Sequence, residues 1–215
     1  MNNGGFFKEL ERNTGYPGVG DKYEMTQLLN GASVIITDPE TNEEVEIEGV
    51  ISTSISLNAH LKMPLFCLTQ IDSTSLRIVK EEEHSVDCVL DFGGKDIENI
   101  IKDFGRYALI VANIGEFQRR IFNAAKESDL NVLQKSVVYE DFNVTSRERI
   151  LAQRNSDPRY FFFKRKEFAY QREYRVILPG VQTDTSFCLD IGDISDISHI
   201  IEVEKFDGMV LKLHK

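Results

Sequence analysis

Several features that mark common enzyme classes are missing from this chain of 215 residues. It contains no tryptophan, and its four histidines show no paired spacing with one another or with the three cysteines. We therefore expect no metal site, because zinc ligands recur at short, fixed spacings. The chain also has no Gly-x-Ser-x-Gly elbow for a nucleophilic serine and no glycine-rich strand-to-helix turn for a dinucleotide.

Long apolar runs are absent as well, since none approaches the roughly 20 residues that cross a bilayer. The N-terminus has no basic region followed by an apolar block, which argues against a signal peptide. Cys67, Cys88 and Cys188 each lie in an apolar, strand-like run, and their number is odd. We expect a cytoplasmic protein without a membrane partner, in which these residues are buried free thiols.

Basic residues are scarce: 25 Lys and Arg stand against 35 Asp and Glu, which gives a net charge of −10. This balance opposes non-specific binding to DNA or to anionic membranes. The segment 159–175, here called the basic island, is the exception. Its cations are Arg159, Lys164, Arg165, Lys166, Arg172 and Arg175, and it contains two glutamates. It either binds an anionic small molecule or nucleotide, or neutralises acidic groups of the same protein.

Apolar periodicity predicts many short strands and a few helices over residues 1–215, which we expect to form a single α+β domain. The sheet should be mainly antiparallel or mixed, with two to four helices. The expected helices are 6–14, 97–104 and 115–127, the last with Phe117, Ile121, Phe122 and Ala125 on one stripe. The expected strands are 32–37, 65–70, 86–91, 107–113, 136–139, 187–191, 200–203 and 209–213.

Residues 43–54 alternate in polarity, with Val45, Ile47 and Ile51 between glutamates. Because successive side chains of a strand point to opposite faces, we expect a hairpin that is exposed on one side only.

The segment 168–178 is rich in aromatic and β-branched residues and ends at Pro179-Gly180, which predicts a strand. Gln171, Glu173 and Arg175 would then share one face, with neighbours about 6.6 Å apart. Tyr170, Tyr174, Val176 and Leu178 would point to the core on the other face. A carboxylate between an amide and a guanidinium is either a site or a salt-bridged structural row.

Two further acids, Asp21 and Glu24, would lie about one helical turn apart. They have the spacing of a helix N-cap and its capping box. With Glu173 they could instead surround a divalent ion, as in a metal-dependent nuclease. Arg175 occupies the place of the lysine in the usual Glu-x-Lys pattern, which weakens the nuclease hypothesis.

The segments Ser52-Thr53-Ser54 and Gln171-Arg172-Glu173 together resemble the arginine–serine–glutamate branch of the ADP-ribosyltransferases. The resemblance implies NAD as cofactor, with Glu173 as catalytic carboxylate and Gln171 as its orienting neighbour. A carboxylate stabilises the positive charge that develops when the nicotinamide–ribose bond breaks. The early-strand arginine of that branch has no counterpart, because Arg12 lies in an expected helix.

In this interpretation the other polar residues hold the ligand. Arg175 and Lys164 would contact phosphate, Ser52 and Ser54 would shape the pocket, and Tyr170 and Arg106 would line it.

A broader pattern resembles a family of uncharacterised bacterial and phage domains found near abortive-infection and other defence genes. The matching stretches are Asp21-Lys22-Tyr23-Glu24, Phe66-Cys67-Leu68, Phe104-Gly105-Arg106-Tyr107-Ala108 and the segment 164–175. Gln171 stands where that family commonly has a glutamate. The resemblance implies a single α+β domain with a shared polar cluster and supplies no reaction.

Three hypotheses follow. The chain is a defence-related or phage-related enzyme that acts on a nucleotide-like ligand by NAD cleavage or ADP-ribosyl transfer. Alternatively, it is a non-catalytic acidic protein that occupies the nucleic-acid groove of a host or phage partner. In the third, Glu173 pairs with Arg175 or Arg106 and only stabilises the sheet.

Overall fold

The computed structural model describes residues 1–215, apart from the side chains of Ala32, Ser33, Val34, Ile36, Val50 and Ile51. The fold is α+β, as expected, and its strands are mostly antiparallel. The central sheet has the strand order β1-β4-β11-β8. These strands are β1 (Asn2–Asn3), β4 (Pro64–Thr69), β11 (Glu173–Ile177) and β8 (Leu133–Ser136). β11 is antiparallel to both of its neighbours, so the segment with the most distinctive sequence lies inside the sheet.

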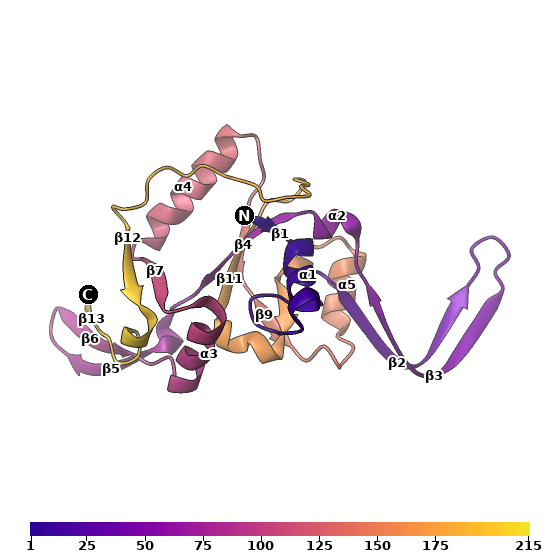
Figure 1. The fold of residues 1–215 in the computed structure, drawn as a ribbon, viewed down its shortest axis with the longest axis horizontal. Helices are drawn as coiled ribbons and strands as arrows, with labels where there is room; N and C mark the ends of the chain where they lie inside the picture. Colours follow the sequence, from indigo (N-terminus) through magenta and orange to yellow (C-terminus); the bar gives the residue numbers. More distant parts are fainter.

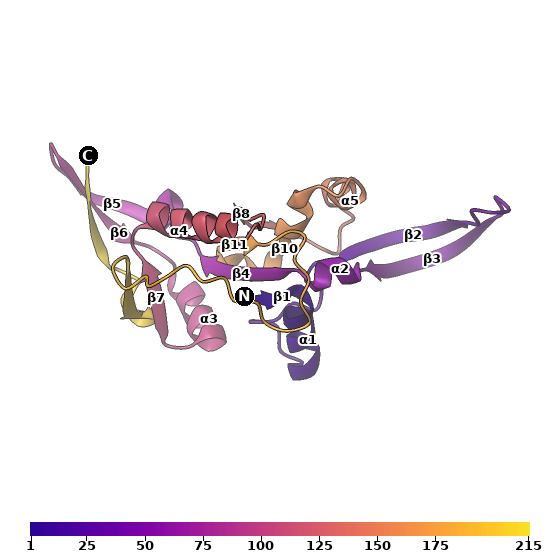
Figure 2. The same ribbon diagram turned by 90° about the horizontal axis from the view of Figure 1, so that it is seen from above.

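Helices cover both faces of this sheet, and Figure 2 shows α1 and α4 on opposite sides of β4. α4 (Ile114–Glu127) buries Phe117 and Ile121 against Val176 of β11. Its Phe122, expected on the same stripe, is 57% exposed. The remaining predicted stripe residues are buried, because positions three and four apart share a helix face.

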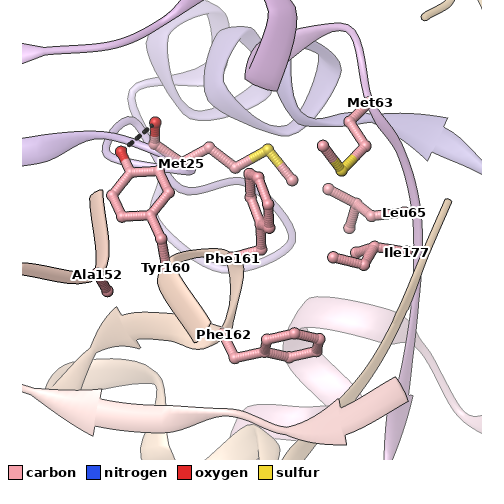
Figure 3. Close-up of a cluster of buried hydrophobic side chains, with 8 residues drawn as sticks. All are labelled: Met25, Met63, Leu65, Ala152, Tyr160, Phe161, Phe162 and Ile177. Atoms are coloured by element: carbon pink, nitrogen blue, oxygen red, sulfur yellow. Dashed lines mark hydrogen bonds between the residues drawn. The ribbon is translucent and has the colours of Figure 1, made fainter. Parts of the chain in front are cut away.

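The opposite face is covered by α1 (Gly4–Thr14), α5 (Arg147–Arg154) and the short 3-10 helix η2 (Pro158–Phe162). α1 begins where the Asn3 side chain accepts a hydrogen bond from Phe6 N, and it ends at Gly15, which has a left-handed φ of +66°. Figure 3 shows the apolar cluster beneath these elements, in which Tyr160 donates a hydrogen bond to the Met25 carbonyl. This face therefore combines an apolar cluster with the polar residues described below.

A second group of elements packs around Phe92, Ile97 and Phe206. It contains α3 (Gly94–Phe104), β7 (Tyr107–Val111) paired with β12 (Ser198–Glu202), and a three-stranded sheet. The strands of that sheet are β5 (Leu76–Glu81), β6 (Ser85–Leu90) and β13 (Val210–His214). Gly105 ends α3, as predicted.

The shorter elements complete the chain. β9 (Val138–Glu140) and β10 (Phe163–Arg165) pair in parallel. The others are α2 (Asn58–Leu61) and the 3-10 helices η1 (Ser73–Ser75), η3 (Lys166–Gln171) and η4 (Val203–Lys205).

The hairpin of β2 (Gln27–Thr37) and β3 (Glu44–Ile55) extends away from the rest of the molecule in both views (Figures 1 and 2). The expectation of one buried side is wrong, since Val45 is 60% and Ile47 46% exposed, like the glutamates between them. Among the described residues, neither of these two side chains belongs to a cluster of buried apolar residues. The side chain of Ile51, part of the predicted pattern, lies outside the described residues.

Two further expectations fail. Residues 187–191 form no strand, because Phe187 exchanges its backbone hydrogen bonds with Met1 alone. The expected strand 136–139 is interrupted at Val137, whose N–H donates to the Glu173 carbonyl. Of the three free thiols, Cys88 is buried and Cys67 partly buried, whereas Cys188 is exposed in the irregular segment.

Candidate functional site

The strand predicted over 168–178 begins only at Glu173. Residues 168–171 belong to η3, and Arg172 follows in the left-handed region with a φ of +46°. This turn places Gln171 outside the sheet, so the expected row on one strand face does not form. Gln171 nevertheless approaches Glu173 through a shared partner, because the Lys164 ammonium donates to both side chains, at 2.7 and 2.5 Å.

Glu173 is fully engaged by cations. One carboxylate oxygen accepts from Lys164, and the other accepts from Arg175 Nε at 2.7 Å. Arg175 also donates to Glu24 at 2.7 Å and to the Phe161 carbonyl at 2.7 Å. Glu173 is 4% and Arg175 1% exposed. These residues are therefore sealed between β11 and the segments that cover it.

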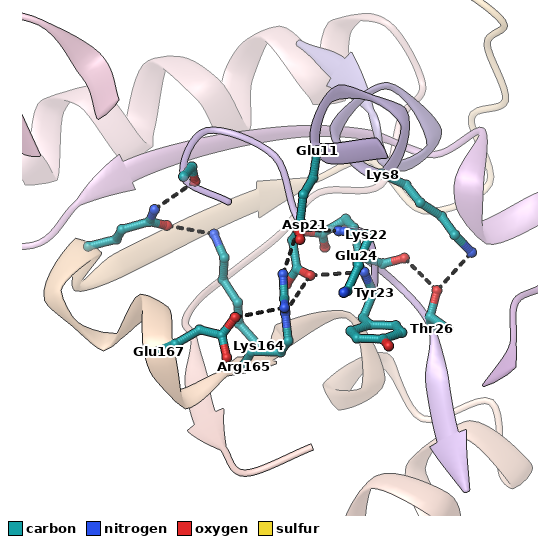
Figure 4. Close-up of polar contacts among 12 residues, drawn as sticks. Lys8, Glu11, Asp21, Lys22, Tyr23, Glu24, Thr26, Lys164, Arg165 and Glu167 are labelled. Atoms are coloured by element: carbon teal, nitrogen blue, oxygen red, sulfur yellow. Dashed lines mark hydrogen bonds and ion pairs between the residues drawn. The ribbon is translucent and has the colours of Figure 1, made fainter. Parts of the chain in front are cut away.

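A second set of ion pairs continues this network towards α1. Arg165, at the end of β10, donates to Asp21 at 2.8 Å and to Glu11 of α1 at 2.5 Å. Figure 4 shows these contacts of Arg165 next to the Lys164 side chain. The buried charge network, as we define it, consists of Glu11, Asp21, Glu24, Lys164, Arg165, Gln171, Glu173 and Arg175.

Asp21 and Glu24 do not cap a helix, contrary to one of the two expectations for them. Residues 22–25 form turns, in which Asp21 accepts a hydrogen bond from Tyr23 N and its carbonyl accepts from Glu24 N. The turn directs both carboxylates inward, towards Arg165 and Arg175 respectively. They are buried network members at 2% and 4% exposure.

The charges of the network do not cancel, because four carboxylates face three cations. Burial raises the pKa of Glu24 and of Asp21 above their ordinary values, although Arg175 and Arg165 oppose the shift. Burial acts in the same direction on Glu173, but Arg175 and Lys164 outweigh it and lower its pKa. The network thus shifts the pKa of Glu173 in the opposite direction from those of Glu24 and Asp21.

The network contains half of the six cations of the basic island, and two more have partners elsewhere in the protein. Lys164, Arg165 and Arg175 are paired inside the protein, Arg159 pairs with Asp157, and Arg172 donates to Ser75 and the Phe92 carbonyl. The hypothesis that the island neutralises acidic groups of the same chain is therefore supported. Lys164 and Arg175, expected to contact phosphate, instead have carboxylate partners.

Glu173 does not face the open, ligand-sized hollow that the catalytic role expected for it would require, because it is 4% exposed. A cleft with a volume of about 740 Å³ is lined mainly by apolar residues, many of them from β4, β7 and α3. Within the described residues, Glu173, Lys164 and Arg175 are absent from its lining, whereas Cys67 and Tyr174 belong to it. Burial and the neighbouring Glu173 raise the pKa of the Cys67 thiol well above its ordinary value, which disfavours the nucleophilic thiolate.

The other predicted site residues lie apart from Glu173. Ser52 and Ser54 are exposed on β3, opposite Asn30 and Leu28, and Arg106 is exposed between α3 and β7. No hydrogen bond or ion pair among the described residues joins these three to the network. Tyr170 reaches its edge, because its hydroxyl bonds Asp103 and accepts from Gln171 at 3.3 Å.

The nuclease hypothesis also lacks support, since Asp21, Glu24 and Glu173 each pair with a cation. Among the described side chains, no group of three or more His, Cys, Asp or Glu is arranged to hold a metal ion.

Sequence reasoning missed Glu11 and Arg165 as network members. Glu11 lies one turn after Phe7 and Lys8 on the buried side of α1, so its place on that helix face was a usable signal. Arg165 was noted only as one cation of the basic island, and nothing local distinguishes it from its exposed neighbour Lys166.

Comparison with protein-family models, with curated proteins and with solved structures found no match. None of the helices in the described chain has the length and apolar character needed to span a bilayer.

Proposed function

We propose that this chain is a non-catalytic binding protein, and that its hairpin β2–β3 contacts a cationic surface of a protein partner. A nucleic-acid groove of a host or phage protein is a surface of this kind. The observation that carries the proposal is the hairpin itself, which extends from the body with acidic and apolar side chains exposed together (Figure 1). The sealing of the buried charge network supports it, because the best catalytic candidate has no access to a ligand.

Negative charge is concentrated on the hairpin. Residues 27–55 contain six carboxylates and no Lys or Arg, so they supply more than half of the net charge of −10. The six are Asp38, Glu40, Glu43, Glu44, Glu46 and Glu48, and all are exposed. A concentrated negative charge accelerates encounter with a basic surface and disfavours acidic partners.

Both faces of the hairpin also expose apolar side chains, because Ile35 pairs with Glu46 whereas Val45 and Ile47 alternate with the glutamates. Ile35, Val45 and Ile47 are 57%, 60% and 46% exposed. Single exposed apolar residues are ordinary, but several on one projecting hairpin offer apolar area whose burial by a partner would stabilise a complex by about 25 cal/mol per Å². We expect the carboxylates to determine the rate of association and the apolar residues to slow dissociation.

A pull-down from host lysate at low and high salt tests the proposal with three baits. They are the wild type, the triple variant Glu44→Gln, Glu46→Gln, Glu48→Gln, and the triple variant Glu81→Gln, Glu82→Gln, Glu83→Gln. Both variants remove three exposed carboxylates, one set from the hairpin and the other from the β5–β6 turn. Their net charges are therefore equal.

We expect the wild type and the β5–β6 variant to capture the same basic partner at low salt, and the hairpin variant to lose it. Capture should weaken at high salt, because salt screens exposed charges. Equal capture by both variants would show that net charge, and not the hairpin, is responsible for binding the partner. Capture of no partner at either salt concentration would contradict the proposal.

A further inference from the structure

The apolar cleft of about 740 Å³ lies between the central sheet and the elements packed around Phe92. One wall is β4 and the other is β7, and both strands contribute consecutive lining residues, 66–71 and 108–112. We propose that this cleft binds an extended peptide segment of a partner, which adds a strand between β4 and β7. The inference does not depend on the hairpin, which lies elsewhere in the fold (Figure 1).

The backbone of β4 has unpaired groups on the cleft side. Hydrogen bonds from Gln70 N to the Arg172 carbonyl and from Leu178 N to the Pro64 carbonyl show that even-numbered residues of β4 bond β11. In an antiparallel pair the residues between them point their N–H and C=O groups the other way. β1 pairs with this outer edge only at Pro64 and Leu65, so the backbone groups of Cys67 and Thr69 extend beyond it.

The same reasoning applies to β7. Bonds from Ala112 N to the Ile197 carbonyl and from Val203 N to the Arg106 carbonyl show that even-numbered residues of β7 bond β12. The N–H and C=O groups of Leu109 and Val111 therefore point away from β12. Within the described chain, no hydrogen bond is made by the outward backbone groups of β4 at Cys67 and Thr69 or of β7 at Leu109 and Val111.

Leu109, Val111, Cys67 and Thr69 all line the cleft, so two open strand edges face the same space. Proteins usually protect open edges with charge, proline or a covering element, because an open edge pairs readily with another chain. Here, instead, partly exposed apolar residues line the cleft: Phe66, Leu109 and Ile114 are 41%, 52% and 51% exposed. Backbone groups on both walls call for a ligand with its own alternating N–H and C=O groups, which is an extended peptide.

Charge around the cleft indicates the composition of that peptide. Asp72, Asp91 and Asp193 directly precede or follow lining residues and are exposed. Asp96, beside Ile97, is half-buried and lies 3.7 Å from Arg172. Acidic residues outnumber basic ones among the sequence neighbours of the lining. The partner segment should therefore alternate apolar and polar residues and carry Lys or Arg at its ends.

The test uses a synthetic peptide, Lys-Lys-Val-Thr-Val-Thr-Val-Thr-Lys-Lys, and two analogues with N-methyl groups on either the valines or the threonines. A strand inserted between two edges uses the amides of both sets, so each analogue should bind at least about tenfold more weakly. Binding is measured by calorimetry on the full chain. Ala112→Trp, at an exposed lining position, should block the site, whereas Ala59→Trp, exposed on α2, should not.

Amide hydrogen exchange locates the peptide. In the free protein the amides of Leu109, Val111, Cys67 and Thr69 should exchange faster than those of Ile110 and Leu68, and the peptide should slow the first set. Equal binding of the methylated analogues, unchanged exchange at these amides, or no binding at millimolar peptide would each overturn the proposal. Occupation of the cleft by the dye ANS that the peptide fails to displace would indicate a site for small apolar molecules and would also overturn it.

Discussion

The buried charge network and the hairpin β2–β3 invert the usual distribution of residues in opposite ways. The network places charged side chains inside, with Arg175 1% and Glu173 4% exposed. The hairpin places apolar side chains outside, with Val45 60% exposed. The first inversion is compensated within the molecule, because each charged residue of the network has an oppositely charged partner. The second has no such compensation within the part of the chain that the structure describes, since Val45, Ile47 and Ile35 remain 60%, 46% and 57% exposed.

This difference shows where to look for function. A buried charge is costly unless it is paired, and a paired one needs no ligand to explain it. An apolar surface that projects into water, by contrast, gains free energy only when something covers it. The sequence drew attention to Glu173 because the residues around it are chemically active, yet Glu173 is buried, whereas the hairpin and the cleft are accessible from solvent.

The largest expected effect tests the pairing inside the network. Glu173→Gln leaves Lys164 and Arg175 buried without that carboxylate, so the free energy of unfolding should fall by about 3–5 kcal/mol. Urea denaturation measures the change. Glu167→Gln is the control, because Glu167 also pairs with a network cation, Arg165, but from a position that is 57% exposed. Its loss should be about 1 kcal/mol or less, and equal losses in the two variants would mean that burial does not set the strength of these pairs.

We expect a smaller effect when the same substitution is made in the buried core and on the exposed hairpin. Ile177→Val removes one methylene from a fully buried side chain and should lower the free energy of unfolding by about 0.5–1.5 kcal/mol. Ile47→Val makes the identical change on the hairpin and should alter it by less than about 0.5 kcal/mol. If Ile47→Val cost as much, the hairpin would pack against the body in solution and the contrast drawn here would be wrong.

The pH dependence of stability separates two acids within the network. The pKa of Glu24 is raised in the folded state, so its contribution is complete at low pH and is lost as pH rises through that value. The pKa of Glu173 is lowered, so its contribution is present above the ordinary value and is lost as pH falls. Glu24→Gln should cost about 1 kcal/mol at neutral pH.

We expect the free energy of unfolding, measured between about pH 4 and pH 8, to decline less steeply with rising pH in Glu24→Gln than in the wild type. An unchanged profile would mean that Glu24 is ionised in the folded protein throughout this range.

The smallest expected effect concerns NAD. Incubation of the wild type with labelled NAD should show no turnover, because Glu173 is enclosed and Ser52 and Ser54 lie on the exposed hairpin. Turnover that Ser52→Ala and Ser54→Ala together abolish would restore the ADP-ribosyltransferase hypothesis. Both serines are exposed, so the double variant should fold normally and its activity can be interpreted.

Local patterns determined much of the fold. The apolar stripe of 115–127, the end of α3 at Gly105 and the alternation of β11 from Glu173 onward were all predictable, because helix and strand periods are properties of neighbouring residues. The start of β11 was not. Whether residues 168–171 extend the strand or coil into η3 depends on Lys164, which draws Gln171 and Glu173 to one point.

The ion-pair partners of the buried charges could not be predicted from the sequence for a related reason. Arg165 and Glu11 are 154 positions apart, and Arg175 and Glu24 are 151 apart, so no local spacing could pair them. The order of residue types alone determined which positions carry charge and which segments alternate between polar and apolar residues. Only the packing of α1 and the turns after it onto β11 decided that Lys164, Arg165 and Arg175 form ion pairs inside the protein. The physical reason is that burial removes the water that would otherwise solvate each ion separately.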